Sequence, residues 1–169
     1  MRMTDILSPM APPIRLTVPG ELRYRPIAVR VVAEAARLVS SSSNTTEPDD
    51  TIAHDVRDPF DTAVVSAFME IFNNVAIHAY KRAHTPGTIE LVITPNEREL
   101  VIEIQDHGAP FDIDHVAPLP TDLDEHSLPE GGMGIHIAKT MLDEMTYEPG
   151  PPNLWRLCKR LPKSRTTRS

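Results

Sequence analysis

The chain has 169 residues, of which 40% are hydrophobic and 24% charged, and this composition is typical of one folded domain with a substantial core. Its formal net charge of −7 argues against a sequence-independent nucleic-acid binder, because phosphate contacts need clustered Lys and Arg side chains. A single cysteine excludes an internal disulfide, and without a signal-peptide core or an apolar run of membrane-spanning length we expect a cytoplasmic protein with no membrane contact.

The two ends of the chain differ in composition from its middle. Prolines recur in residues 1–12, which we expect to form a flexible arm. Residues 163–169 form a basic polar tail without a structural pattern. The predicted domain therefore spans residues 13–162.

The domain is predicted to begin with a strand and a helix. Residues 14–18 alternate apolar and polar side chains and stop at a Pro-Gly pair, the pattern of a strand followed by a turn. Residues 22–39 carry a looser helical pattern, and Pro26 lies near the start, where a helix tolerates proline. Residues 40–58 are rich in Ser, Thr and Asp, which indicates a loop.

An amphipathic helix is predicted over residues 60–80. Asp58 can cap its first turn, and Pro59 fits the first helical position, where its missing N–H costs nothing. Apolar residues recur at helical spacing and form a stripe that faces the core: Phe60, Val64, Ala67, Phe68, Ile71 and Val75.

A row of polar side chains lies beside that stripe. Glu70, Asn74 and His78 follow one another at intervals of four residues, so a regular helix stacks them on one face. A carboxylate one turn before an amide is unusual next to a buried stripe unless a polar ligand binds there. Taken alone, the row is equally consistent with a solvated flank.

The second half of the chain contains a predicted hairpin, a long loop, a helix and a last strand. Residues 88–94 and 100–105 alternate apolar and polar side chains and are joined by a short polar turn. Residues 106–132 are acidic and rich in proline, and a loop of this length is often a lid. A helix is predicted over 134–147 and a strand over 153–159.

This order of elements favours an α+β fold. Neighbouring strands pair while the helices are set apart from them, so we expect a two-layer sandwich. Its sheet is expected to be mixed but mostly antiparallel and to be covered on one face by helices.

A turn motif follows directly on the second strand of the hairpin. Asp106 at the strand end offers a carboxylate acceptor, and Gly108 allows the backbone to approach a flat ligand closely. The alternative is an ordinary Asp-x-Gly turn, which is common in proteins.

A glycine-rich motif runs straight into the third predicted helix. Gly131, Gly132, Met133 and Gly134 would let backbone N–H groups and the positive end of the helix dipole meet a phosphate. The alternative is a flexible hinge for the lid.

In this order, the three motifs resemble a known family. The row of Glu70 and Asn74, the turn at Asp106 and the glycines before the last helix resemble the N, G1 and G2 boxes of the GHKL (Bergerat-fold) ATPases. The His-Ala-Tyr ending of the helix and the Pro-Phe-Asp after Gly108 most resemble the bacterial anti-sigma-factor serine/threonine kinases of partner-switching pathways. Histidine kinases fit less well, since they usually carry Asn where Glu70 stands. The resemblance covers roughly residues 14–160.

The resemblance implies a role for each motif residue. Glu70 would be the general base for the attacking hydroxyl, and Asn74 would hold Mg²⁺ against the phosphates of ATP. Asp106 would accept a hydrogen bond from the adenine amino group, and Gly108 would give the adenine ring room.

The resemblance also implies a phosphate site and a lid. Gly131, Gly132, Met133 and Gly134 would surround the phosphates, and residues 112–130 would form the ATP lid. Relatives often carry Arg where this chain has Pro129, so Lys139 or His136 would have to supply the basic contact.

The implied function is an ATP-dependent protein kinase of the anti-sigma type. It would bind a sigma factor, phosphorylate Ser or Thr on an antagonist protein and form a homodimer through the strand at residues 14–18. The alternative is a nucleotide-binding regulator that sequesters its partner without phosphoryl transfer. A stand-alone ATPase is a third possibility.

Overall fold

The computed structural model describes residues 12–42, 58–80, 87–112 and 133–162. The described helices and strands are, in chain order, β1 (Ile14–Pro19), η1 (Leu22–Tyr24), α1 (Arg25–Ser42), α2 (Pro59–Asn74), η2 (Val75–Ala79), β2 (Thr88–Pro95), β3 (Glu99–Asp106), α3 (Met133–Met141), β4 (Glu144–Glu148) and β5 (Asn153–Arg160). The predicted arm and basic tail fall outside the described residues, apart from Pro12. So do the greater part of the predicted loop at 40–58 and all of the predicted lid beyond Asp112.

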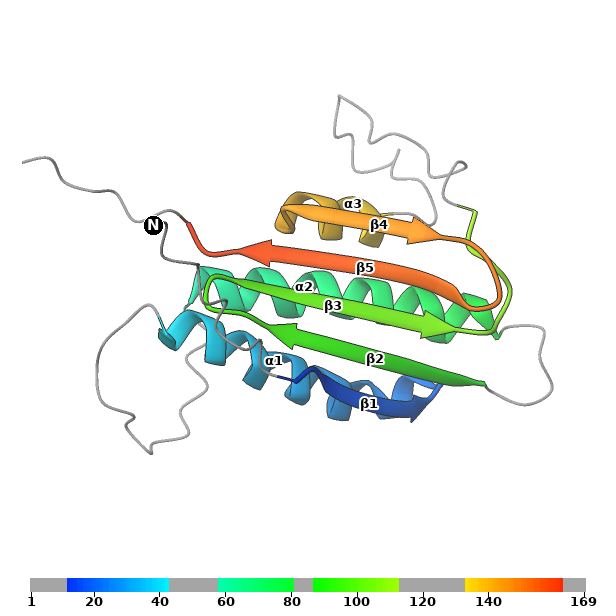
Figure 1. Ribbon diagram of the computed structural model, residues 1–169. Helices are drawn as coiled ribbons and strands as arrows, with labels where there is room; N and C mark the ends of the chain where they lie inside the picture. Colours follow the sequence, from blue (N-terminus) through cyan, green and yellow to red (C-terminus); the bar gives the residue numbers. More distant parts are fainter. Residues whose placement is uncertain (1–11, 43–57, 81–86, 113–132, 163–169) are drawn as a thin grey trace, which may run out of the picture.

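The strands form one sheet in the order β1-β2-β3-β5-β4, and each of its four pairings is antiparallel. The three long helices lie together behind this sheet, as Figure 1 shows. The predicted two-layer α+β fold is confirmed, although the described sheet is antiparallel throughout and not mixed. β1 lies at one edge of the sheet, which suits the predicted dimer interface. The dimer itself stays a prediction.

α2 forms as its sequence predicts. The Asp58 carboxylate accepts from the backbone N–H of Phe60 at 2.7 Å and from that of Asp61 at 3.4 Å, so the first turn is capped. The predicted stripe is buried, together with Phe72, against the inner face of the sheet. From the sheet, Ile104, Trp155 and Leu157 contribute to the same core. α2 is therefore the central core helix.

The length and composition of residues 59–79 would also suffice for a membrane span. It is the only such helix among the described residues. The apolar stripe of this helix is buried in the core of the domain, so a core helix has this length and composition here.

The prediction of one helix over residues 134–147 is wrong. α3 ends at Met141, and residues 144–148 form the edge strand β4, which pairs with β5. In β4 the half-buried Met145 and Tyr147 alternate with exposed neighbours, which is the period of a strand. Leu142 and Met145 also fit the helical spacing of α3, so the apolar pattern alone did not mark the break.

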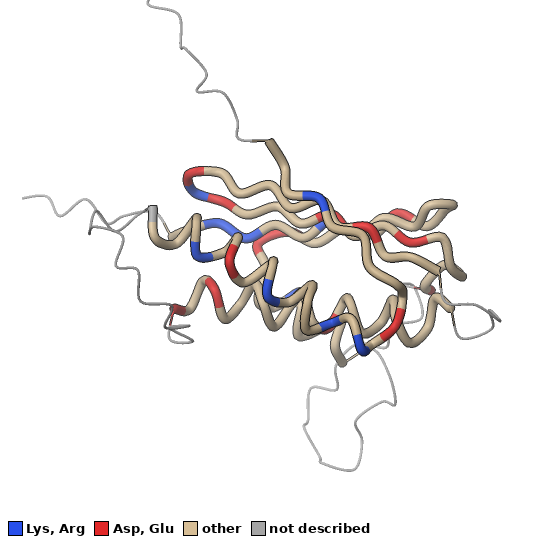
Figure 2. Tube along the Cα trace, turned by 90° about the horizontal axis from the view of Figure 1, so that it is seen from below, with Lys and Arg blue, Asp and Glu red and all other residues tan. Residues whose placement is uncertain are grey.

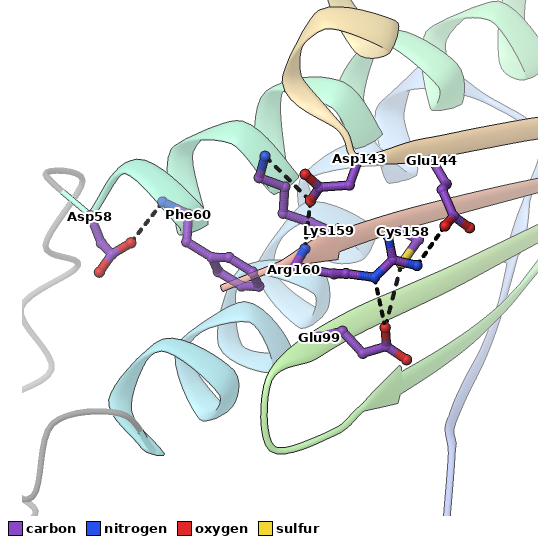
Figure 3. A network of polar contacts seen from close by, with 8 residues as sticks. All are labelled: Asp58, Phe60, Glu99, Asp143, Glu144, Cys158, Lys159 and Arg160. Atoms are coloured by element: carbon purple, nitrogen blue, oxygen red, sulfur yellow. Dashed lines mark hydrogen bonds and ion pairs between the residues drawn. The ribbon is translucent and has the colours of Figure 1, made fainter. Parts of the chain in front are cut away.

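A polar network joins β3, β4 and β5 at one end of the sheet (Figure 3). The guanidinium of Arg160 contacts Glu99 at 3.3 Å and Glu144 at 2.6 Å, while its backbone N–H donates to Asp143. Cys158 is buried beside Glu99, and burial raises the pKa of its thiol. These ion pairs are partly exposed, so each adds little stability. They link the edge strand β4 to β5 and β3 at the end of the sheet that lies away from Asp106.

Charged residues of both signs are spread along the described chain (Figure 2). α1 carries Arg25, Arg30 and Arg37 together with Glu34, and the strands carry both acidic and basic residues. The net charge of −7 is therefore not concentrated in one described element.

Candidate functional site

The acid–amide pair lies on the central helix. Glu70 and Asn74 are both half-buried and stand one turn apart on α2, which packs between α1 and α3 (Figure 1). The side-chain nitrogen of Asn74 is buried and has no hydrogen-bond partner among the described residues. Burying an unpaired polar group costs on the order of 1–3 kcal/mol, so its retention favours a polar ligand at this place.

The row of three predicted polar residues is shortened to two. Directly after Asn74 the helix changes to the π-helical segment η2, in which each turn closes on the fifth residue instead of the fourth. A spacing of four therefore no longer stacks His78 below Asn74, and the His78 side chain is exposed.

The start of α3 lies against Glu70. A Cβ atom added to Gly134 would collide with Oε2 of Glu70 and lie 3.3 Å from its carboxyl carbon. The structure thus brings Gly134, the last glycine of the motif, against the acid–amide row, and a side chain at this position would require Glu70 to shift. Met133 is the first residue of α3 and is exposed, whereas Gly131 and Gly132 lie outside the described residues.

Asp106 is held by two neighbours at the end of β3. It is only 2% exposed, and its Oδ1 accepts from the backbone N–H of Gly108 at 2.8 Å and from the amide of Asn153 at 3.0 Å. The same amide also donates to the carbonyl of Gly108 at 3.1 Å. Both of these donors go to Oδ1, so neither of them occupies Oδ2, and that oxygen could accept from a ligand.

Gly108 packs directly against the end of the central helix. The N–H of Ala109 donates to the carbonyl of Ala79 at 2.8 Å, and a Cβ on Gly108 would lie 2.6 Å from the carbonyl carbon of Ala79. The motif is therefore more than an ordinary turn. In the structure Gly108 is needed for contact with Ala79, whatever room it also gives a ligand.

Replacing Gly108 with alanine should therefore destabilise the protein. The new methyl group would overlap backbone atoms of Ala79, which cannot turn aside as a side chain can. We expect a loss of about 1–3 kcal/mol in the free energy of unfolding, measured in denaturant. Gly150→Ala is the control, because a Cβ on Gly150 would lie 3.3 Å from its nearest neighbour, the carbonyl oxygen of Pro152. Equal stability of Gly108→Ala and the wild type would contradict this packing.

An aromatic cluster holds the chain where it leaves the Asp106 turn. The N–H of Phe111 donates to the hydroxyl of Tyr147 at 2.7 Å, and the Tyr147 ring lies 4.3 Å from that of Trp155. Burial raises the pKa of Tyr147, so its hydroxyl stays protonated at neutral pH. Neither Tyr147 nor Asn153 stands out in the sequence. The apolar pattern places Tyr147 in the predicted helix over residues 134–147, and Asn153 meets its partner only when β3 and β5 pair.

Lys139 is not brought to the start of α3. It is exposed in the last turn of the helix, five residues after Gly134 or about 7.5 Å further along the axis.

The site is also poor in metal ligands. No group of three or more His, Cys, Asp or Glu in the described part of the chain could hold a metal ion. A divalent cation here would depend on Asn74 and on the phosphates of its ligand.

The chain is similar to known proteins over much of its length. The family model described as "Histidine kinase-like ATPase domain" matches residues 18–157. The serine-protein kinase RsbW of Staphylococcus aureus is 32% identical over 90 residues, which cover 50% of this chain and 57% of the relative. RsbW from the strains bovine RF122 / ET3-1 and MRSA252 is 31% identical over 84 residues, covering 47% of this chain and 53% of each relative. The chain thus spans about half the length of the curated relatives it matches.

Proposed function

Because this chain belongs to the histidine kinase-like ATPase domain family, we propose that it binds ATP and phosphorylates Ser or Thr on an antagonist protein. We further propose that it sequesters a sigma factor, in keeping with the anti-sigma-factor kinases that its motifs resemble. The naming of its curated relatives as serine-protein kinases supports the same reaction class.

One observation carries the proposal: the contact between α2 and α3. It sets the first turn of α3, where the positive end of the helix dipole favours an anion, beside the carboxylate of Glu70. Asn74, with its buried unpaired nitrogen, stands one turn away on the same helix. Phosphate at the start of α3 would therefore meet a carboxylate and an amide together. A helix that served only to pack in the fold would need neither group there.

The chemistry assigned to these residues is positioning and proton transfer. The carboxylate of Glu70 accepts the proton of the substrate hydroxyl while the hydroxyl oxygen bonds to the terminal phosphorus and ADP leaves. Mg²⁺ would neutralise charge on the phosphates, and Asn74 is the residue that would hold it. The backbone at the start of α3 binds phosphate, and Asp106 and Gly108 bind the adenine ring of ATP.

The rival function is a nucleotide-binding regulator that sequesters its partner without transferring phosphate. One observation favours it: of the two residues predicted to supply the basic contact to the terminal phosphate, Lys139 lies in the last turn of α3, which leaves only His136 in the first turn. Glu70 favours the kinase, since a regulator without transfer has no use for a carboxylate beside the phosphate site.

Labelled Mg-ATP separates the possible functions. The protein is incubated with it and with the antagonist encoded beside its gene, and label should appear on Ser or Thr of the antagonist. Label that never transfers, although ATP and partner both bind, would support the regulator. Phosphate release without any protein acceptor would support a stand-alone ATPase.

A further inference from the structure

The ring of Tyr80 fills the space between two glycines. A Cβ on Gly20, which follows β1, would lie 2.6 Å from Cε2 of the ring, and a Cβ on Gly87, which precedes β2, would collide with it. The two glycines are themselves joined, since the N–H of Gly20 donates to the carbonyl of Gly87 at 2.7 Å. The ring is therefore fixed in position by the backbone of two loops.

The hydroxyl of Tyr80 makes two hydrogen bonds. It donates to the carbonyl of Thr88 at 2.8 Å, and it accepts from the backbone N–H of His107 at 3.2 Å. Burial raises the pKa of Tyr80, with the nearby Asp106 adding to the effect, so the hydroxyl remains a donor at neutral pH. A single oxygen thus joins the first residue of β2 to the residue that follows Asp106.

Tyr80 and Ala79 together hold both sides of Gly108. The N–H before it, from His107, binds the Tyr80 hydroxyl, and the N–H after it, from Ala109, binds the Ala79 carbonyl. Residues 79 and 80 end the helix that begins with α2 and carries Glu70 and Asn74. These two hydrogen bonds therefore connect the part of the site assigned to phosphate with the part assigned to the base.

We propose that Tyr80 is a positioning residue of the nucleotide site, and that its hydroxyl sets Asp106 at the place where it distinguishes adenine from guanine. The inference rests on the proposed binding of ATP. Tyr80 acts through the backbone of His107 and touches no reacting atom, so its effect falls on base recognition and not on the transfer step.

Tyr80→Phe tests this by removing one oxygen while the ring stays between Gly20 and Gly87. The affinity for ATP should fall by roughly 3- to 10-fold, the worth of about one hydrogen bond, with a much smaller loss for GTP. The ratio of the two affinities, measured by calorimetric titration, should therefore fall. The rate of transfer at saturating ATP should stay within about twofold, because Glu70 and the start of α3 are unchanged.

Two further variants make the result decisive. Gly20→Ala keeps the hydroxyl but presses on the ring, and it should lower the preference for ATP in the same direction. Tyr24→Phe is the matched control and should leave both affinities unchanged. Among the described contacts this half-buried tyrosine, the last residue of η1, makes none to residues 106–109.

The possible failures can be told apart. If Tyr80→Phe loses stability but keeps the wild-type ratio of ATP to GTP affinity, Tyr80 is a structural anchor only, and the inference is wrong while the proposed function stands. If the wild type binds neither nucleotide, the proposed function and the inference are both overturned.

Discussion

Replacing Glu70 with glutamine is expected to reduce phosphoryl transfer by roughly 10²–10⁴-fold, while the affinity for ATP changes by no more than a few-fold. Glutamine keeps the shape of the side chain and its contact with Gly134 but removes the proton acceptor. A general base acts mainly in the transition state, so the ground-state complex should form nearly as well. Sequestration of the partner should survive for the same reason.

Asn74→Ala should fail in a different way. Asn74 is assigned to Mg²⁺, and this ion draws on the phosphates and only a few protein ligands, so losing one should weaken Mg-ATP binding as well as transfer. Asn73→Ala is the control, because the Asn73 side chain is turned to Arg25, whose guanidinium donates to it at 2.8 Å. The measurement is the rate of phosphorylation beside an ATP titration for each variant.

Either of two results would contradict these assignments. A Glu70→Gln variant that phosphorylates its antagonist at the wild-type rate would remove the general base. An Asn74→Ala variant with unchanged affinity for Mg-ATP would contradict the assignment of the Asn74 side chain to Mg²⁺.

Local signals in the sequence were sufficient where one element carries its own pattern. Asp58 and Pro59 marked the start of α2 because capping depends on residues only two or three apart. The alternation in β2 and β3 marked the hairpin for the same reason. The motif residues Glu70 and Gly134 could be linked in advance only through the family resemblance, since 64 positions of sequence separate them.

Features that depend on distant partners could not be predicted from the sequence. The amide of Asn153 reaches Asp106 only because β3 and β5 pair in one register, and the two residues are 47 positions apart. β4 was missed because its identity as a strand comes from pairing with β5. The π-helical turn that moves His78 off the polar row left no mark in the apolar spacing. For Asn153 and β4 the missing information lay in the pairing of strands.

The second large effect is expected at Asp106. The wild type should prefer ATP to GTP, because a carboxylate oxygen accepts from the amino group of adenine but faces the carbonyl oxygen of guanine with a second acceptor. The lost hydrogen bond and the unpaired acceptor should cost on the order of 1–3 kcal/mol, or roughly 5- to 150-fold in affinity. Comparable affinities for the two nucleotides would show that Asp106 does not read the base.

Asp106→Asn should do more than weaken ATP binding; it should shift the preference toward GTP. In the wild type both protein donors, from Gly108 and Asn153, go to the single oxygen Oδ1. Asparagine can keep its own oxygen at that place, so the fold should be retained, and its NH₂ group then replaces Oδ2. That group opposes the amino group of adenine and can donate to the carbonyl oxygen of guanine. Titration of both nucleotides against the variant measures the change, and loss of both affinities by an equal factor would mean that Asp106 supports the site without selecting its base.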